Sequence, residues 1–141
     1  MSALAGMEAG EALAAAIAAG VAAIPGVNGC AEGRPIVATP PYATIEIGPE
    51  LDWGHKTGAG RDIRFRLILR DEGETPARLR ALTRKADEAI GTATGTIAGW
   101  RTVTCVMLRS AVTGSGPRKW TATRDYRVRM LASDAGAGPA T

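Results

Sequence analysis

The most regular pattern in the chain is an alternation of apolar and basic positions near its middle. The apolar positions are Ile63, Phe65, Leu67 and Leu69, and the positions that alternate with them are Arg64, Arg66, Ile68 and Arg70. A period of two places successive side chains on opposite faces of a β-strand. The pattern therefore predicts a strand that is buried on one face and carries mostly arginine on the other.

A glycine-rich segment comes directly before this strand. It contains Trp53, Gly54, His55, Lys56, Thr57, Gly58, Gly60 and Arg61. Glycine has no Cβ and can take left-handed backbone angles, so a regular ladder does not continue easily through such a segment. We expect a tip between two strands, and this tip is either a plain turn or a loop that contacts a partner.

One segment before this strand and one after it also have the alternating pattern of a strand. Residues 42–47 alternate so that Ala43, Ile45 and Ile47 share one face. The Gly48-Pro49 pair after them allows a bend or a bulge. Residues 120–131 place one set of side chains inward and another outward. The inward set is Tyr126, Val128 and Met130, and the outward set is Asp125, Arg127 and Arg129.

Residues 100–108 form one more predicted strand, the third in chain order. They are rich in β-branched residues, and both faces carry apolar side chains. This predicts a central strand, or a strand whose outer face is covered. The residues that follow, Ser110 to Lys119, include Gly114, Ser115, Gly116 and Pro117 and predict a loop or a mobile hairpin end.

Two segments have the spacing of amphipathic helices. Residues 7–23 are rich in alanine and leucine, which favour helix. The second helix is expected to start with Thr75 as N-cap and Pro76 in its first turn, and to end at a Gly91 cap. The apolar stripes are Leu13, Ile17, Val21 and Ile24 in the first segment and Leu79, Leu82, Ala86 and Ile90 in the second.

The predicted order is helix, strand, strand, helix, strand, strand. This order implies an α+β fold in which a roughly four-stranded, mainly antiparallel sheet packs one face on two helices. Residues 1–131 form a single domain in this interpretation, and residues 132–141, rich in alanine and glycine, form a flexible C-terminal tail.

Composition limits the core and the class of partner. The chain has 141 residues and few aromatics, with one Phe, two Tyr and three Trp, so burial against another subunit would help stabilise it. The formal charge of +3 permits contact with DNA without indicating it. The apolar run near the N-terminus has no preceding Lys or Arg and is too short to span a bilayer, which predicts a cytoplasmic chain.

We find no pattern typical of catalysis. In GHKTGAGR, His55 precedes the Lys-Thr pair where a phosphate-binding loop needs glycine, and a strand follows in place of a helix. His55 is the sole histidine, and Cys30 and Cys105 make neither a disulfide framework nor a zinc site. Cys105 is expected to be a small buried side chain. The sequence therefore predicts no enzyme, no metal and no cofactor.

The arginines of the outer sheet face leave three interpretations open. Arg64, Arg66, Arg127 and Arg129 could line a phosphate-binding surface, form salt bridges between subunits, or belong to a solvated sheet face. A flat sheet face offers no element that enters a DNA groove, so we do not expect sequence-specific reading of DNA.

The region from Pro40 to Leu131 resembles the tail-completion or tail-terminator proteins of long-tailed phages and of phage-derived gene transfer agents. The most specific features are Pro41-Tyr42 at the start of a strand, the D-W-x-x-K-T-G-x-G-R segment from Asp52 to Arg61, and the aliphatic strand after it. The resemblance implies a structural protein that forms rings, typically hexameric. Such rings end growth of the tail tube and join the tail to the head-side connector.

This resemblance also implies partners and locations. The partners are other copies of the chain, the tail tube protein and the head-side connector or stopper protein, with only non-specific proximity to DNA in the lumen and no membrane. The chain is expected in the bacterial cytoplasm during assembly and then at the tail-neck junction of the particle. In this role Trp53 to Arg61 is a contact loop, and the four arginines serve the ring lumen or the subunit interface.

Two other functional classes remain open. A head-completion or stopper protein elsewhere in the neck would share the size and the ring habit. A small nucleic-acid-binding module would use the arginine face, and its DNA affinity would fall steeply with salt.

Overall fold

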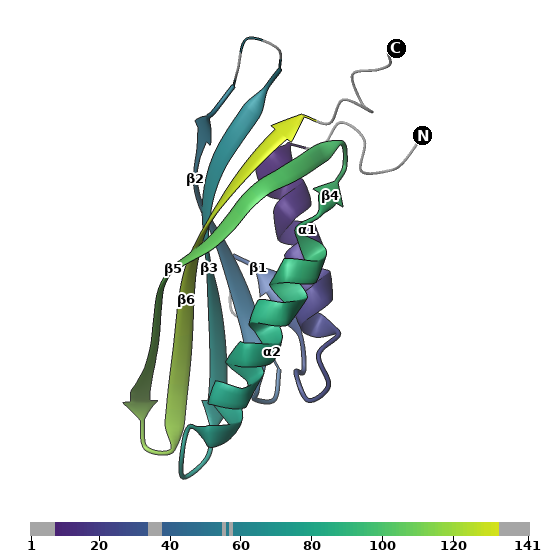
Figure 1. Cartoon of the computed structure of the whole chain (residues 1–141). Coiled ribbons are helices and arrows are strands. Elements are labelled where there is room, and N and C mark those ends of the chain that lie inside the picture. Colours follow the sequence, from purple (N-terminus) through teal and green to yellow (C-terminus); the bar gives the residue numbers. More distant parts are fainter. Residues whose placement is uncertain (1–7, 34–37, 55, 57, 133–141) are drawn as a thin grey trace.

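A computed structural model describes residues 8–33, 38–54, 56 and 58–132. In chain order the elements are α1 (Ala9–Ala22), β1 (Cys30–Glu32), β2 (Tyr42–Asp52), β3 (Gly60–Glu72), α2 (Ala77–Ala93), β4 (Thr96–Ile97), β5 (Trp100–Gly116) and β6 (Lys119–Ala132). Figure 1 shows long, twisted strands that extend past the helices at the end where β2 and β3 form a hairpin.

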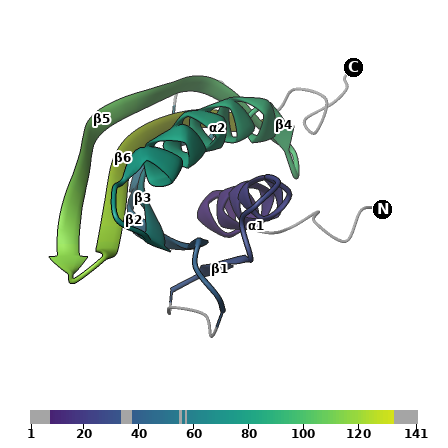
Figure 2. The ribbon, with the colours of Figure 1, turned by 90° about the horizontal axis from the view of Figure 1, so that it is seen from below.

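Within the described residues, six strands form one sheet in the order β1-β2-β3-β6-β5-β4. All neighbouring strands are antiparallel except β1 and β2. The sheet curls around both helices, which lie on its concave side (Figure 2). The predicted mainly antiparallel sheet with two helices on one face is thus confirmed. The expected strand number of four is wrong, because β1 and β4 are too short to show any periodicity.

The concave face carries the core, as the alternation predicted. Ile63 and Leu67 on β3 are fully buried, and so are Val128 and Met130 on β6. Between them the rings of Phe65 and Tyr126 stack with their centroids 4.8 Å apart. The predicted inward sets of these two strands are therefore confirmed, while Ile68 of the outward set is also buried.

The predicted bulge after residue 47 is also confirmed. The pairing of β2 with β3 shifts register between Ile47 and Glu50. A Cβ on Gly48 would lie 3.0 Å from the carbonyl oxygen of Arg64, so the two backbones approach too closely there for a larger residue. Beyond the bulge β2 continues to Asp52, five residues further than the sequence predicted.

For residues 110–119 the predicted alternative of a hairpin end is confirmed, and the alternative of a loop over the whole segment is wrong. β5 continues to Gly116, the turn consists of Pro117 and Arg118, and β6 starts at Lys119. Within the turn Arg118 has φ +58°, and Gly116, the last residue of β5, has φ +145°. The indole of Trp120 donates a 3.0 Å hydrogen bond to the Gly73 carbonyl and holds the hairpin against the end of β3.

The expectation that residues 100–108 form a central or covered strand is wrong as well. β5 lies one place from the sheet edge, and its outer neighbour β4 pairs only with Trp100 and Arg101. The apolar residues on both faces of β5 are therefore partly exposed. Four of them, Val103, Val106, Met107 and Leu108, are between 41% and 45% exposed.

The residues at which the two helices begin and end differ from the predictions. α1 starts at Ala9, and the predicted start at Met7 lies outside the described residues. The N-cap of α2 is Pro76 and not Thr75, whose hydroxyl accepts a 3.4 Å bond from the Ala77 amide. Gly91 lies inside α2 and is no cap.

α2 ends at Ala93 because the next residue closes it. The Thr94 amide and hydroxyl both donate to the carbonyl of Ile90, at 3.0 and 2.8 Å. Ala132, the first residue of the predicted tail, is the last residue of β6, and residues 133–141 lie outside the described part.

Two carboxylates attach α2 to the sheet. Asp71 at the end of β3 is 5% exposed and accepts two hydrogen bonds from the Arg78 guanidinium. Asp87 accepts hydrogen bonds from Arg124 and from the Tyr126 hydroxyl on β6. Burial, and next the bond to Asp87, raise the pKa of Tyr126, so this hydroxyl stays protonated and donates. The helix is thereby tied to the sheet near both ends of its inner face.

We predict that Arg78→Ala lowers the free energy of unfolding by about 1–2 kcal/mol, because it leaves the buried Asp71 carboxylate without its cation. The expected loss of stability is small for a broken ion pair because the Arg78 side chain is 61% exposed and solvent screens the pair. Urea titration measures the change. The matched control is Arg84→Ala, also on the exposed side of α2, which should stay within about 0.5 kcal/mol of the parent protein. Equal losses in both variants would contradict the prediction.

Candidate functional site

The structure places the predicted contact loop at one end of the molecule. β2 ends at Asp52 and β3 begins at Gly60, so Gly60 and Arg61 belong to the strand and the connection, here called the tip, is residues 53–59. Figure 1 shows the hairpin of β2 and β3 extending beyond the ends of the neighbouring strands. His55 and Thr57 lie outside the described residues, and Lys56 is exposed.

Two aromatic rings and two arginines fix the base of the tip to the sheet. The Arg129 guanidinium lies over the Trp53 ring, 5.2 Å from its centroid, and the Arg61 guanidinium lies 5.3 Å from the Trp100 centroid. Arg61 also lies 3.4 Å from the carboxylate of Glu50. The partners in the two cation–π contacts, Trp100 and Arg129, lie on β5 and β6, whereas Glu50 lies on the neighbouring β2. The base of the tip therefore rests partly on strands far along the chain.

The glycines in and directly after the tip differ in how closely they are packed. Gly54 and Gly60 do not use the left-handed φ region that glycine can take. A Cβ on Gly60 would lie 2.3 Å from the Trp53 carbonyl oxygen, and the Trp53 amide donates a 2.9 Å bond to the Gly60 carbonyl. Gly60 is thus required by the close approach of two backbones, whereas a Cβ on Gly58 would meet nothing within 4 Å.

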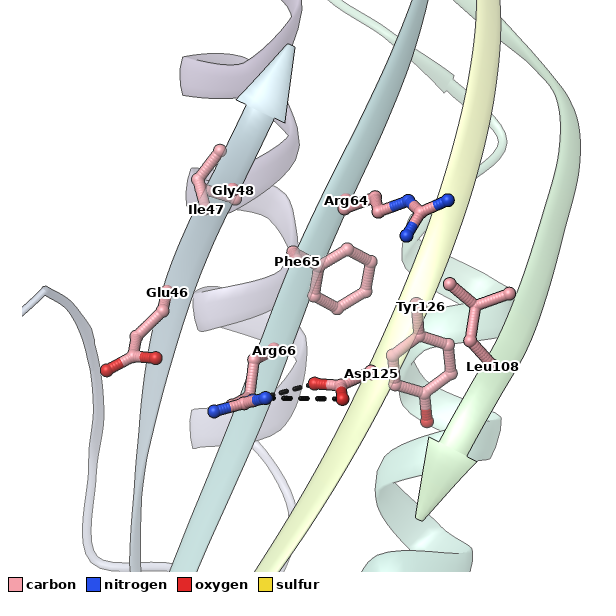
Figure 3. Close-up of a pocket in the computed structure, with 9 residues that line it drawn as sticks. All are labelled: Glu46, Ile47, Gly48, Arg64, Phe65, Arg66, Leu108, Asp125 and Tyr126. Carbon is pink, nitrogen blue, oxygen red and sulfur yellow. Dashed lines mark hydrogen bonds and ion pairs between the residues drawn. The ribbon is translucent and has the colours of Figure 1, made fainter.

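The second predicted surface is the arginine face on the convex side of the sheet. Arg66 donates hydrogen bonds of 2.7 and 3.3 Å to Asp125 on the adjacent strand, as Figure 3 shows. Arg129 donates a 3.0 Å bond to Asp62 in the same manner. The hydrogen bond with Asp125 is the main cause that raises the pKa of Arg66. Half of the four predicted arginines are therefore paired with carboxylates of their own sheet.

The other two arginines lie side by side, and no described carboxylate pairs with them. Arg64 and Arg127 are opposite each other in the register of β3 and β6. Among the described residues the Nε atom of Arg127 is buried and has no hydrogen-bond partner. Two like charges in opposite positions destabilise a strand pair, so this point of the face has a local excess of positive charge.

A shallow depression of about 440 Å³ lies beside this pair. Its lining residues are Glu46, Ile47, Gly48, Arg64, Phe65, Arg66, Leu108, Asp125 and Tyr126 (Figure 3). It forms where β2 and β5 both bulge, at Gly48 and Leu108. Because acidic and basic groups alternate along its floor, the face lacks the continuous positive charge of a surface that follows a nucleic-acid backbone.

Sequence reasoning missed the carboxylates that pair with the arginines and the exposed surface of β5. Asp62 and Asp125 neutralise arginines on other strands, and cross-strand partners cannot be read from one strand alone. The apolar residues on both faces of β5 were visible in the sequence, but they indicated a covered strand in place of an exposed one.

Metal-ligating side chains and cysteines are scattered over the described residues. They contain no group of three or more His, Cys, Asp or Glu side chains placed to hold a metal ion. Cys30 and Cys105 are both half-buried beside the core, and burial raises the pKa of the Cys30 thiol to about 11 and also raises that of Cys105. Thiols that stay protonated at neutral pH are poor nucleophiles. No helix of the described part is long and apolar enough to span a membrane.

We predict that Gly60→Ala lowers the free energy of unfolding by about 1–3 kcal/mol, because its methyl group would overlap the Trp53 carbonyl. Gly58→Ala, in the same segment, should change it by less than about 0.5 kcal/mol, since its methyl group meets open space. Chemical unfolding of both variants tests this difference. Similar stabilities of the two variants would show that the backbone at Gly60 has room to adjust.

No protein-family model matches this chain, and no curated protein sequence matches it. Its structure is similar to one chain of a solved structure described as "Virion of native gene transfer agent (GTA) particle". The TM-score is 0.52 and the sequence identity 19%, and the match covers 88% of this chain and 95% of that chain. At this identity the likeness shows that the two chains share a fold over nearly their full lengths.

Proposed function

We propose that this chain is a structural protein of a virion-type particle and that it serves as the tail terminator of a phage or gene transfer agent. In this role it caps the tail tube and joins the tube to the head-side connector. The observation that carries the proposal is the fold it shares, over nearly all of both chains, with a chain of a gene transfer agent virion. The resemblance of the Asp52 to Arg61 segment to tail-terminator proteins supports the finer assignment.

The shape of the subunit suits a protein that contacts different partners above and below itself. The β2–β3 hairpin projects at one end of the sheet and the β5–β6 hairpin at the other (Figure 1). In a ring whose axis runs along the strands, these hairpins would point to opposite faces of the ring. One face would then meet the tail tube protein and the other the head-side connector, while further copies of the chain complete a ring, typically a hexamer.

The arginine face fits a role inside such an assembly. Arg66 and Arg129 are held in place by carboxylates, so they set a fixed pattern of charge instead of acting as mobile cations. Arg64 and Arg127 leave a local positive excess. We assign these four residues to the electrostatics of the ring lumen or of the subunit interface, with DNA only passing nearby.

The test of the proposed function is deletion of the gene in the strain that produces the particles. We expect tail tubes of uncontrolled length together with heads that carry no tail, because nothing stops the tube or joins it. Electron microscopy of the particles measures both effects, and an expressed copy of the gene should reverse them. Reconstruction of complete particles should place the chain as a ring at the tail-neck junction.

Two other outcomes of the deletion would contradict this function. Tubes of normal length beside unjoined heads would indicate a head-completion or stopper protein. Normal particles, combined with a purified protein whose DNA affinity falls steeply with salt, would indicate a nucleic-acid-binding module.

We further predict that replacing Trp53 and Lys56 together by alanine lowers the yield of joined particles about tenfold or more, since a few anchoring side chains carry most of an interface's binding energy. Lys56→Ala alone should already weaken joining, because Lys56 is exposed and its loss leaves the contact of Trp53 with Arg129 intact. The control is Lys119→Ala, an exposed lysine at the opposite end of the sheet. Thermal unfolding shows that each variant is folded. Normal joining by the double variant would show that the tip is only a turn.

A further inference from the structure

The exposed large apolar side chains gather on two strands. In the part of the chain that the structure describes they are Leu51, at 60% exposure, and Val103, Val106, Met107 and Leu108, at 41% to 45%. The first lies on β2 and the other four on β5. Single exposed apolar residues are common on protein surfaces, but a concentration on two particular strands marks a contact surface.

These strands also have free hydrogen-bonding edges on opposite sides of the sheet. β4 pairs with Trp100 and Arg101, and the Thr102 amide reaches the Gly95 carbonyl at 3.0 Å. Beyond that point no described residue pairs with the outer edge of β5 as far as Gly116. On the other side β1 pairs only with residues 43–45 of β2, so the described chain leaves the second half of β2 open too. Long free edges with apolar side chains favour pairing with another strand.

The two free edges lie at the same height in the sheet. Following the register from strand to strand, Ile47 is level with Phe65, Tyr126 and Met107. In the same way Leu51 is level with Asp62, Arg129 and Thr104. A rotation that carries one copy onto the next without moving it along the strands would therefore bring the free part of β5 beside the free part of β2.

The charges of the two edges are complementary. β1 and β2 contain acidic residues and no Lys or Arg, whereas β5 contains two arginines and no acid. One register row reads Glu46, Arg66, Asp125, Arg109, so the sign of charge alternates across the sheet. The row ends with an exposed acid on β2 and an exposed base on β5. Adding a second copy to the row would continue the alternation without placing two like charges together.

The strand directions are compatible with this pairing. β2, β3, β6 and β5 are antiparallel in turn, so β5 runs opposite to β2. Rotation about an axis along the strands preserves these directions, and β5 of one copy would meet β2 of the next as an antiparallel neighbour. Contact between two different edges is head-to-tail, and it closes into a ring when the rotation divides the circle.

We infer that a second copy of this chain occupies the free edge of β5, through antiparallel pairing with the free part of β2. Glu46 of one copy faces Arg109 of the next, and Leu51 packs among Val103, Thr104 and Val106. The inference rests on the ring of the proposed function and names the surface that builds it. It also explains why a strand with so much apolar surface stands next to the edge of the sheet.

A charge swap tests the pairing. Glu46→Arg and Arg109→Glu should each weaken self-association about tenfold or more, because each places like charges together at the contact. The double variant should associate more tightly than either single variant, because the pair across the contact again has opposite charges, while the like charges placed beside Arg66 and Asp125 within each sheet stay. Analytical ultracentrifugation measures self-association of the purified protein. If assembly needs the tail tube, the copy number of the chain in particles is measured instead. Arg84→Glu on α2 is the control. A double variant no better than the weaker single variant would overturn the inference.

Disulfide cross-linking provides a second measurement that does not depend on stability. In a background with Cys30→Ala and Cys105→Ala, the pair Leu51→Cys and Thr104→Cys should form a ladder of covalent multimers on oxidation. Cysteines link only when their Cα atoms are about 4.4–6.8 Å apart. Each single variant should form no ladder, and neither should Leu51→Cys with Ser115→Cys, because Ser115 lies near the far end of β5. Absence of the ladder, or an equal ladder in the control pair, would overturn the pairing.

The two proposals fail in different ways. A ring at the tail-neck junction that gives no cross-link between positions 51 and 104 would overturn the edge pairing and leave the proposed function in place. Cross-linked multimers of a protein that is absent from the neck would overturn the proposed function and leave the edge pairing in place. A cross-link from position 104 to the tail tube protein would show that the tube, not a second copy, occupies the edge.

Discussion

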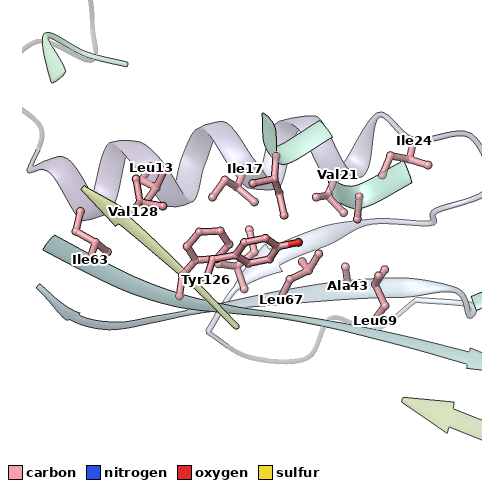
Figure 4. Packing of buried hydrophobic residues seen from close by; sticks show 14 of the residues in the cluster. Leu13, Ile17, Val21, Ile24, Ala43, Ile63, Leu67, Leu69, Tyr126 and Val128 are labelled. Carbon is pink, nitrogen blue, oxygen red and sulfur yellow. The ribbon is translucent and has the colours of Figure 1, made fainter. Parts of the chain in front are cut away.

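The burial of α1 against the sheet is the contact on which the rest of the structure depends. Leu13, Ile17 and Val21 are completely buried and lie over the side chains of β3 and β6 (Figure 4). Each such side chain contributes about 1.5–3 kcal/mol relative to exposure. The helix is rich in alanine and also buries small residues at its start, where the Gly10 amide donates a 3.2 Å hydrogen bond to Glu50. A slender helix lets the sheet curl closely around it.

The curl of the sheet determines which surface remains for partners. The helices occupy the concave side, and in the described part of the chain the convex side and the later halves of β2 and β5 remain uncovered. Bulges concentrate exposed apolar groups on β5, since its pairing with β6 shifts near Val103 and again near Leu108. A bulge inserts a residue and interrupts strict alternation, so neighbouring apolar residues all reach the surface. The bulges that bend β5 therefore also expose the apolar side chains of the surface that we assign to a second copy.

Local periodicity explains what could be predicted from the sequence. The stripes of both helices and the inward faces of β3 and β6 were correct because each pattern repeats within one element. The contacts of Trp53 with Arg129 and of Arg61 with Trp100 were not foreseen, because they join segments distant in the chain. The end of β5 was left open between a loop and a hairpin end because Gly114, Gly116 and Pro117 resemble turn residues, and it is pairing with β6 that keeps the segment extended. The tip was located correctly, but its folded base was not.

That folded base changes the energetics of any contact at the tip. Trp53 and Gly60 are already joined by a backbone hydrogen bond, and the Trp53 ring already rests on Arg129. Fixing the backbone of a residue costs about 1–2 kcal/mol, and for these positions the cost is met when the chain folds. A partner that binds the exposed Lys56 therefore need not order the strands that carry it. Preorganisation of this kind lets a small number of contacts give stable joining between rings.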